Sequence, residues 1–333
     1  MSTSKNKTVA YRYAENRGRF VKPCPGTPRY VCCGYRIVNI AQGCTLGCTY
    51  CILDNYFDAD TPVLFSNIEK LTEELKQNIA ESKGILRFGT GEFTDSLLYK
   101  EYYKMYSRIF PIIAGSSNTI LELKTKTVHI DPLVNMERYE RIIMSWSLNS
   151  HFIASQEEHN APTIEERIKA AQKVEACGYK LAFHFDPIVY YDGWEQGYET
   201  TIKTLFHHID PNSIVYVSMG SLRFSPHVQD SLMRRSDLYL QGDFIRGMDG
   251  KMRYFRPIRT KLYRNLLCHL NRYIPEEIVY LCMENQDVWK DVFGIDNMTS
   301  DKLSNRLDRA CMRAFKNLTK GLCISQQATP REG

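Results

Sequence analysis

The sequence predicts an α/β protein whose core is a parallel sheet with crossover helices. Short apolar runs rich in branched residues alternate about six times with longer amphipathic segments. Alternation of this kind is typical of strand–helix–strand units, in which neighbouring strands run parallel. Because such crossovers are right-handed, the sheet is either doubly wound or curled into a barrel, and the alternation does not decide between the two.

The expected elements follow one another through the first two thirds of the chain. Ser66 and Glu69 have the spacing of a capping box, Thr163 opens a later helix, and Gly178 is placed to end it. Strands are predicted at 35–40, 85–88, 119–124, 141–147, 180–185 and 213–219, helices at 66–82, 96–109, 163–176 and 194–208, and a short turn at 131–137.

Length and composition fit a soluble globular protein of one large or two moderate domains. The chain has 333 residues, of which 43% are apolar and 24% are charged, and disorder, collagen and coiled coil are poor fits to that composition. No run approaches the roughly 18 apolar residues of a membrane span. The start of the chain lacks the apolar segment of a secretory signal, so we expect a cytoplasmic protein. We expect an irregular leader at 1–30, the alternating domain at 31–220, and a basic region at 221–333 that completes the substrate site.

Positive charge is concentrated in one part of the chain. The net charge is +5, but residues 221–272 alone hold eleven Lys and Arg against four Asp and Glu. Within 251–264, six basic residues are interleaved with three aromatic residues. Cations can neutralise phosphates while aromatic rings stack on bases, so this segment predicts a nucleic-acid contact, with a solvated basic face as the alternative.

Three of the eleven cysteines form a local cluster, Cys44-x3-Cys48-x2-Cys51, directly after the first predicted strand. In a reducing compartment such a cluster binds metal more often than it forms disulfides. A structural zinc site normally has four protein ligands, and no fourth Cys or His follows at suitable spacing. An iron–sulfur cube held by three cysteines leaves one iron open to an exogenous ligand. The cluster therefore predicts such a centre, with a zinc knuckle or unrelated core cysteines as the alternative.

The cysteine spacing, with the aromatic Tyr50 before the last cysteine, resembles the motif of the radical S-adenosylmethionine superfamily. The resemblance implies a partial (β/α)6 barrel with a basic C-terminal extension, and a [4Fe-4S] cluster on Cys44, Cys48 and Cys51. It also implies that S-adenosylmethionine binds the open iron. Reductive cleavage would then give methionine and a 5′-deoxyadenosyl radical, which abstracts hydrogen from the substrate.

Further segments are similar to the spore photoproduct lyase family, whose members repair photodamaged thymine in DNA by carbon–carbon bond cleavage. They lie in the family's order at 88–95, 123–126, 145–149, 220–224, 280–284 and 288–294. The narrower resemblance implies a lyase with DNA as its partner, bound through 251–264. It also implies an electron donor of the flavodoxin or ferredoxin type.

The resemblance assigns cofactor contacts to residues at the carboxyl ends of predicted strands, where parallel barrels place their sites. Tyr50 would hydrogen-bond the cofactor, Glu92 would accept from its amino group, and Lys126 would meet its carboxylate as a point charge. The remaining assigned contacts are Gly89, Gly91, Thr94, Ser147 and Asn149, and the residues matched to the DNA-entering hairpin are Arg253, Tyr254 and Arg256. The sequence does not decide whether His184 and Asp186 contact the substrate or form a hydrogen-bonded pair in the core.

The loop after the second predicted strand departs from the family. Members carry a cysteine there that donates a hydrogen atom to the product radical, whereas this chain reads Gly91-Glu92-Phe93-Thr94. A carboxylate or a phenyl ring does not readily donate a hydrogen atom, so either another residue donates or the substrate differs. Cys32 and Cys33 are candidates to enter the site, with burial as small apolar residues as the alternative.

Two other functions stay open from the sequence. One is a radical enzyme that acts on a peptide or a small molecule. The other is a non-catalytic, zinc-stabilised module that binds nucleic acid.

Overall fold

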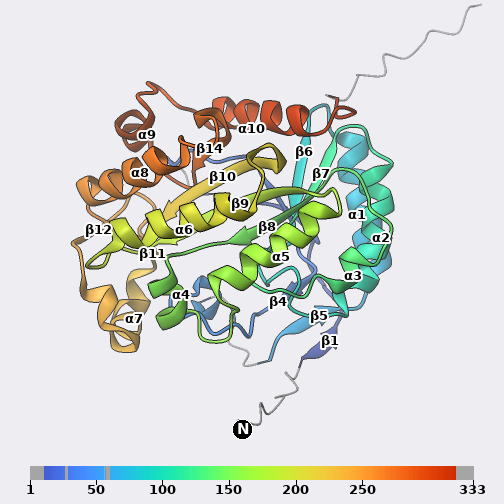
Figure 1. The fold of residues 1–333 in the computed structure, drawn as a ribbon. Helices are drawn as coiled ribbons and strands as arrows, with labels where there is room; N and C mark the ends of the chain where they lie inside the picture. Colours follow the sequence, from blue (N-terminus) through green and yellow to red (C-terminus); the bar gives the residue numbers. More distant parts are fainter. Residues whose placement is uncertain (1–10, 27–28, 56, 58–60, 320–333) are drawn as a thin grey trace, which may run out of the picture.

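The computed structural model describes residues 11–26, 29–55, 57 and 61–319. Its centre is an eight-stranded sheet with the strand order β14-β10-β9-β8-β7-β6-β3-β2. The sheet curls, and helices cover its outer side (Figure 1). The strands are β2 (Val21–Pro23), β3 (Arg36–Val38), β6 (Leu86–Gly89), β7 (Thr119–Thr125), β8 (Ile142–Ser147), β9 (Lys180–Ile188), β10 (Ile214–Ser221) and β14 (Val279–Leu281).

The topology confirms the predicted strands and selects the curled sheet. All six predicted strands form, and every pair from β3 to β14 is parallel, whereas β2 pairs antiparallel with β3. Strands β6 to β10 lie in the sheet in their sequence order. Successive right-handed crossovers in one direction put the helices on one side of the sheet, which leaves the other side concave. The result is the partial barrel implied by the family resemblance.

The helices agree with the sequence at some ends and differ at others. Helix α5 begins at the predicted Thr163, which forms a capping box with Glu166, and Gly178 follows the helix with a φ of +84°. The capping box at Ser66 is wrong, because the Ser66 hydroxyl donates to the Ala14 carbonyl and the N-cap is Asn67. The helices of this part are α1 (Ile68–Glu81), α2 (Tyr102–Ala114), α3 (Asp131–Val134), α4 (His151–Glu157), α5 (Ile164–Ala176) and α6 (Trp194–His208), with 3-10 turns at η1 (Ile52–Asn55) and η2 (Pro211–Ser213).

Helix α2 begins six residues later than predicted. The Ser96 carbonyl accepts from the Tyr106 hydroxyl at 2.6 Å, and the Ser96 hydroxyl lies 2.7 Å from that of Thr90. These contacts occupy the groups that a helix starting at Ser96 would use. The segment before Tyr102 is therefore a series of turns at the carboxyl end of β6.

Both ends of the chain contain strands that the sequence did not predict. Residues 1–10 of the expected irregular leader lie outside the described residues, but β1 (Arg12–Ala14) and β2 form within it. A small sheet joins β1, β5 (Val63–Phe65) and β4 (Ala41–Gln42). Beyond residue 221, a small antiparallel sheet of three strands comes first in the chain, and β14 then adds one more strand to the barrel. The strands of the small sheet are β11 (Arg223–Phe224), β13 (Met252–Tyr254) and β12 (Phe244–Arg246).

The C-terminal region is otherwise helical, as predicted. Helix α10 packs against β10, and α8 packs beside α6. The elements are η3 (Pro226–Val228), α7 (Gln229–Arg235), η4 (Asp237–Leu240), α8 (Arg256–Leu270), η5 (Glu276–Ile278), α9 (Gln286–Phe293) and α10 (Ser300–Ala314). In the part of the chain that the structure describes, no helix has the length and apolar character needed to cross a membrane.

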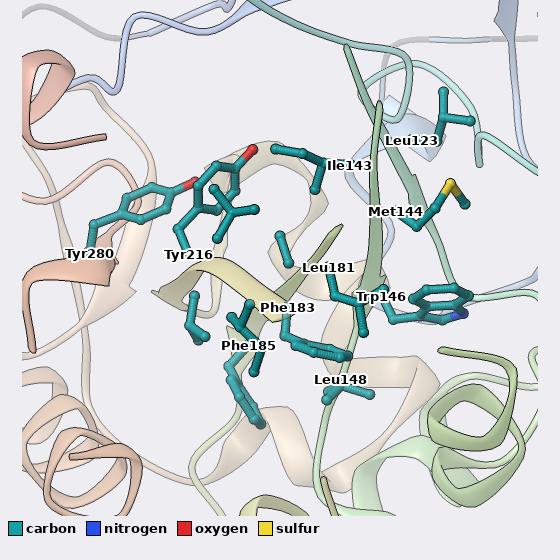
Figure 2. Close-up of a cluster of buried hydrophobic side chains, with 14 of the residues drawn as sticks. Leu123, Ile143, Met144, Trp146, Leu148, Leu181, Phe183, Phe185, Tyr216 and Tyr280 are labelled. Carbon is teal, nitrogen blue, oxygen red and sulfur yellow. The ribbon is translucent and has the colours of Figure 1, made fainter. Parts of the chain in front are cut away.

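Strand alternation gives the sheet two chemically different faces. On β9, Leu181, Phe183 and Phe185 lie in the apolar layer (Figure 2), and Phe185 packs against Tyr198 of α6. The intervening His184 and Asp186 point to the concave side, because successive side chains of a strand face opposite ways. The concave side is where the candidate site lies.

A buried ion pair ties α10 to the sheet and supplies a test of the fold. Arg87 Nε of β6 donates to Asp308 Oδ1 of α10 at 3.1 Å, and both side chains are nearly buried. Breaking a buried pair leaves an uncompensated charge, so we expect Asp308→Ala to lower the free energy of unfolding by about 3 kcal/mol. Urea denaturation measures the change. Asn305→Ala, at an exposed position of the same helix, should change it by less than about 0.5 kcal/mol; equal effects would contradict the role of the pair.

Candidate functional site

The three clustered cysteines lie in a tight loop between β4 and η1. Gly43 and Gly47 have φ values of +91° and +65°, which side chains other than glycine rarely adopt. The Cys51 amide donates to the Cys48 carbonyl at 3.0 Å and closes a turn. Cys48 is buried, while Cys44 and Cys51 are partly exposed. The loop therefore presents three cysteine thiols within one compact segment.

The connection between α4 and α5 holds this loop in place. Cys48 and Glu158 form an antiparallel backbone bridge, and the Thr49 amide donates to the Glu157 carbonyl at 2.9 Å. Asn160 donates from its backbone to the Leu46 carbonyl at 2.9 Å. These contacts fix the path of the cysteine loop through the protein's own hydrogen bonds.

A buried network centred on Glu158, which we call the clamp, joins the loop to the barrel. The clamp consists of Tyr50, Lys126, Glu158 and Arg167. The Lys126 ammonium donates to the Tyr50 hydroxyl at 3.0 Å and lies 3.4 Å from Glu158 Oε1. The Tyr50 hydroxyl donates to the same carboxylate oxygen, and Arg167 donates to the other. Arg167 also donates to the Ser147 carbonyl at 3.0 Å.

The clamp controls the charge of its members. Burial alone would raise the pKa of Glu158, but the adjacent Lys126 and Arg167 outweigh it and lower the pKa to about 2. Burial and the Glu158 carboxylate raise the pKa of Tyr50, which stays a neutral phenol. Two predicted cofactor contacts, Tyr50 and Lys126, are thus neighbours at the cysteine loop. The sequence did not identify Glu158 or Arg167 as site residues. In the sequence, the adjacent Glu157 and Glu158 are typical of a solvent-exposed helix end.

The glycines predicted to meet the cofactor are in close contact with the protein itself. A Cβ on Gly89 would lie 1.5 Å from the Tyr35 hydroxyl oxygen, and one on Gly91 would lie 2.7 Å from Lys124 Cβ. Glu92 Oε1 lies 3.7 Å from Lys124 Nζ. The packing explains why glycine is needed at both positions, and cofactor contact at Gly89, Gly91 and Glu92 stays a prediction.

Asp95 anchors this loop to the end of β7. Its carboxylate accepts from the Lys126 amide at 2.6 Å, the Thr125 hydroxyl at 2.7 Å and the Leu97 amide at 2.9 Å. Burial raises its pKa despite these donors. Thr94 is buried, and its hydroxyl lies 2.9 Å from that of Tyr102. The loop is rigidly tied beside Lys126, although the Thr94 hydroxyl is engaged within the protein.

Ser147 and Asn149 lie at the carboxyl end of β8, as predicted. The Asn149 side chain accepts from the Tyr198 hydroxyl at 2.6 Å and donates to the Pro187 carbonyl at 3.0 Å. Its amide is therefore engaged on both sides, which makes it a support for this end of the strand. A direct contact of Ser147 or Asn149 with cofactor stays a prediction.

Five polar side chains at the carboxyl ends of the strands form what we call the mouth group. They are Glu92, Lys124, Asp186, Arg223 and Cys282. Arg223 binds Asp186 in bidentate fashion with both N–O distances at 3.0 Å, and its Nη2 lies 3.8 Å from Cys282 Sγ. Burial would raise the pKa of Asp186, but Arg223 outweighs it and lowers the pKa. His184 and Asp186 thus face the concave side, and each has a charged partner within the barrel.

A second polar layer lies deeper in the barrel, around Glu122. His184 Nε2 lies 2.5 Å from Glu122 Oε1, and His184 Nδ1 lies 2.6 Å from the Ser218 hydroxyl. The Tyr216 hydroxyl donates to Glu122 Oε2 at 2.8 Å. Burial opposes ionisation of Glu122, yet His184 outweighs it and lowers the pKa of the carboxyl to about 2. This layer supports the mouth group from below.

The residues matched to a DNA-entering hairpin are engaged inside the protein. Arg253 is buried, pairs with Asp249 at 2.5 Å and lies 4.2 Å above the Tyr30 ring centroid. Tyr254 is fully buried and accepts from the Tyr190 amide at 3.0 Å. Arg256 is more exposed but pairs with Asp291 at 2.6 Å. The large apolar side chains of this region that reach solvent are instead Ile245, Met248 and Phe255.

Three thiols on one short loop are a donor set that a [4Fe-4S] cluster would accept, with one iron left without a protein ligand. Among the described residues, no three His, Cys, Asp or Glu side chains are grouped so that they could hold a metal ion. Asn39 follows β3, and its buried side-chain amide has no hydrogen-bond partner among the described residues at either atom. By strand alternation it lies on the same face as Tyr35. An unsatisfied buried amide, five residues before Cys44 in the chain, is a group that a bound ligand would satisfy.

Comparison with known proteins identifies relatives of this chain. Residues 32–230 match the family model described as spore photoproduct lyase. The spore photoproduct lyases of a Geobacillus species and of Bacillus subtilis are 26% and 25% identical to it over 175 residues. Each alignment covers 52% of this chain, and 51% and 50% of the respective relative. The chain thus matches about half the length of these curated relatives.

Solved structures share the fold. A spore photoproduct lyase complexed with dinucleoside spore photoproduct superposes with a TM-score of 0.69 at 19% identity, covering 81% of this chain and 80% of the other. A variant of that enzyme with bound S-adenosylmethionine and dinucleoside spore photoproduct also gives 0.69, at 20% identity and the same coverage. These likenesses confirm the partial barrel.

The clamp predicts a large effect of neutralising Glu158. In Glu158→Gln, Lys126 and Arg167 lose their buried counter-charge, and we expect the free energy of unfolding to fall by about 3 kcal/mol. Urea denaturation of the metal-free protein at neutral pH measures it. The matched control is Glu165→Gln on α5, whose exposed pair with His151 should contribute less than about 1 kcal/mol. A similar small loss in both variants would contradict the clamp.

The deeper layer predicts a pH-dependent stability. Glu122 has its pKa lowered from 4.5 to about 2, so its stabilisation is complete above pH 4.5 and is lost as the pH falls through about 2. At neutral pH we expect the free energy of unfolding of Glu122→Gln to be about 3 kcal/mol lower than that of the unsubstituted protein. That difference should shrink steadily between pH 4.5 and 2 in denaturant titrations. The exposed Glu73→Gln variant should show no such pH dependence, and a constant difference for Glu122→Gln would refute the pairing.

Proposed function

Because the chain belongs to the spore photoproduct lyase family, we propose that it is a radical S-adenosylmethionine lyase that repairs photodamaged thymine in DNA by carbon–carbon bond cleavage. Cys44, Cys48 and Cys51 would hold a [4Fe-4S] cluster with one open iron. The observation that carries the proposal is the clamp, which sets Tyr50 and Lys126 against a loop of three thiols. A loop fixed in this way would hold the cluster close to Tyr50 and Lys126, where the cofactor would bind.

The residues of the site have separate roles in this proposal. When bound at the open iron, S-adenosylmethionine supplies the 5′-deoxyadenosyl radical that abstracts hydrogen from the substrate. Lys126 offers a buried positive charge to the cofactor's carboxylate, and Tyr50 orients the Lys126 ammonium through their 3.0 Å contact. Asn39 offers an unpaired buried amide on the face of the sheet that it shares with Tyr35. Walls of buried polar groups, rather than open water, would surround the reacting atoms.

The proposed substrate side is the sheet of β11, β12 and β13. Two relatives of known structure contain a dinucleoside spore photoproduct, which supports DNA as the substrate here. The exposed Ile245, Met248 and Phe255 lie on or beside the β12–β13 hairpin. Apolar side chains at such a position can wedge beside bases and help to extrude a damaged one. Electrons would come from a donor of the flavodoxin or ferredoxin class.

The proposal predicts iron, sulfide and hydrogen transfer together. Protein purified without oxygen should hold about four irons and four sulfides per chain, and Cys48→Ala should lose most of both. With lesion DNA deuterated at the abstracted position, deuterium should appear in 5′-deoxyadenosine, as measured by mass spectrometry.

The exposed thiol Cys268 provides the control, since Cys268→Ala should keep both the iron and the transfer. One zinc per chain without sulfide would support the nucleic-acid-binding module instead. An intact cluster that forms 5′-deoxyadenosine without deuterium would exclude lesion repair and point to another substrate of a radical enzyme.

A further inference from the structure

Four thiols gather on one side of the barrel mouth, apart from the cysteine loop. Cys24, Cys32 and Cys33 come from the segment before β3, and Cys282 comes from the end of β14. Cys24, Cys32 and Cys33 lie close enough together to shift one another's pKa. Cys282 also raises the pKa of Cys24 and of Cys33. None of these four thiols belongs to the cysteine loop, and only Cys282 is a member of the mouth group.

Cys282 is the member of this group that lies among the charged residues of the mouth. Its amide donates to the Met219 carbonyl at 2.8 Å and so continues the pairing of β14 with β10. Tyr280, two residues earlier, packs on Tyr216 inside the barrel with ring centroids 5.9 Å apart (Figure 2). Strand alternation places Cys282 on the same concave face. Arg223 Nη2 donates to its sulfur at 3.8 Å.

The surroundings keep this sulfur protonated. Burial is the main influence and raises the pKa of Cys282 to about 12, and Asp186 acts in the same direction. A thiol in this state is a poor nucleophile and a poor metal ligand, because both roles need the thiolate. It retains the S–H bond, which is weaker than the C–H bond of a methyl or methylene group. A protonated, partly exposed S–H of this kind can give a hydrogen atom to a carbon radical.

We infer that Cys282 is the hydrogen-atom donor that ends the reaction by quenching the product radical. The inference rests on the proposed function, in which hydrogen abstraction from the lesion leaves a carbon radical after bond cleavage. The loop at 91–94 offers a carboxylate, a phenyl ring and a hydroxyl, none of which donates hydrogen atoms readily. Cys282 presents a thiol from the opposite end of the sheet, beside Lys124 and Glu92 of the same mouth group.

The step balances within the protein and one named co-reactant. The S–H bond of Cys282 breaks homolytically, a C–H bond forms on the product thymine, and one unpaired electron stays on sulfur. Cys33 can then transfer a hydrogen atom to the Cys282 sulfur radical, which breaks the S–H bond of Cys33 and forms that of Cys282. The last sulfur radical takes one electron and one proton, the electron coming from the same flavodoxin- or ferredoxin-class donor that the proposed function requires.

Solvent deuterium tests the donor directly, because an S–H group exchanges with water. We expect the repaired thymine formed in deuterium oxide to gain one deuterium in the unsubstituted enzyme. In Cys282→Ala and Cys282→Ser, that gain should fall at least about tenfold, as should the turnover number, while 5′-deoxyadenosine still forms from the first abstraction. The serine variant keeps the size of the side chain, and its O–H bond is too strong to donate. Cys268→Ala serves as the control and should match the unsubstituted enzyme.

A second readout does not depend on turnover. In protein without cluster or cofactor, a dinucleoside lesion should shift the infrared S–H stretching band of Cys282, identified by its absence in Cys282→Ala, and leave the band of Cys268 unchanged. Unchanged deuterium gain in both Cys282 variants would overturn the inference while repair itself stands. If the repaired thymine fails to gain deuterium only in Cys33→Ala, Cys33 is the donor and the inference about Cys282 is also overturned. If the unsubstituted enzyme cleaves no lesion DNA, the proposed function and this inference fall together.

Discussion

The site depends on one buried carboxylate. Glu158 is almost inaccessible to solvent and is paired with both Lys126 and Arg167. A charge removed from water must be matched by partners, so the position of Glu158 dictates where these cations lie. Its backbone also bridges Cys48. The path of the cysteine loop, the end of β7 and the start of α5 are therefore set by the same residue, without any contribution from a metal.

The concave face of the sheet follows from a departure from the usual pattern of parallel strands. Such strands are commonly apolar on both faces, yet here the inner positions of β7, β9 and β10 include Glu122, Lys124, His184, Asp186 and Tyr216. Burying these groups costs free energy that an apolar lining would avoid, and replacing buried ion pairs by apolar residues is often neutral or stabilising. The inner polar layers are thus poorly explained by stability alone. They suit a cavity wall that must hold polar ligands in a fixed orientation.

The sequence predicted the elements whose signals are local. Six strands and helix α6 depend on apolar patterning within each segment, and the start of a helix at Thr163 depends on a few neighbouring residues. The cysteine spacing located the loop, and the family resemblance assigned Tyr50 and Lys126, which the structure brings into contact. Sequence reasoning missed Glu158, Arg167, Arg223 and Cys282, because their partners come from distant elements that only the fold brings together. The Ser66 box failed for a similar reason, since a hydrogen bond to Ala14, 52 residues earlier, replaced the local one.

The basic region shows how charge counting can mislead when the structure is not in view. Eleven cations against four acids in 221–272 suggested a surface for polyanions. Several of those cations are instead used internally, since Arg223, Arg253 and Arg259 are nearly buried and each contacts a carboxylate. Two of these carboxylates, Asp186 and Glu284, lie outside the region that was counted. The β12–β13 hairpin offers solvent the apolar Ile245 and Met248 together with Arg246, so its binding to DNA would combine the insertion of side chains beside bases with the neutralisation of phosphates.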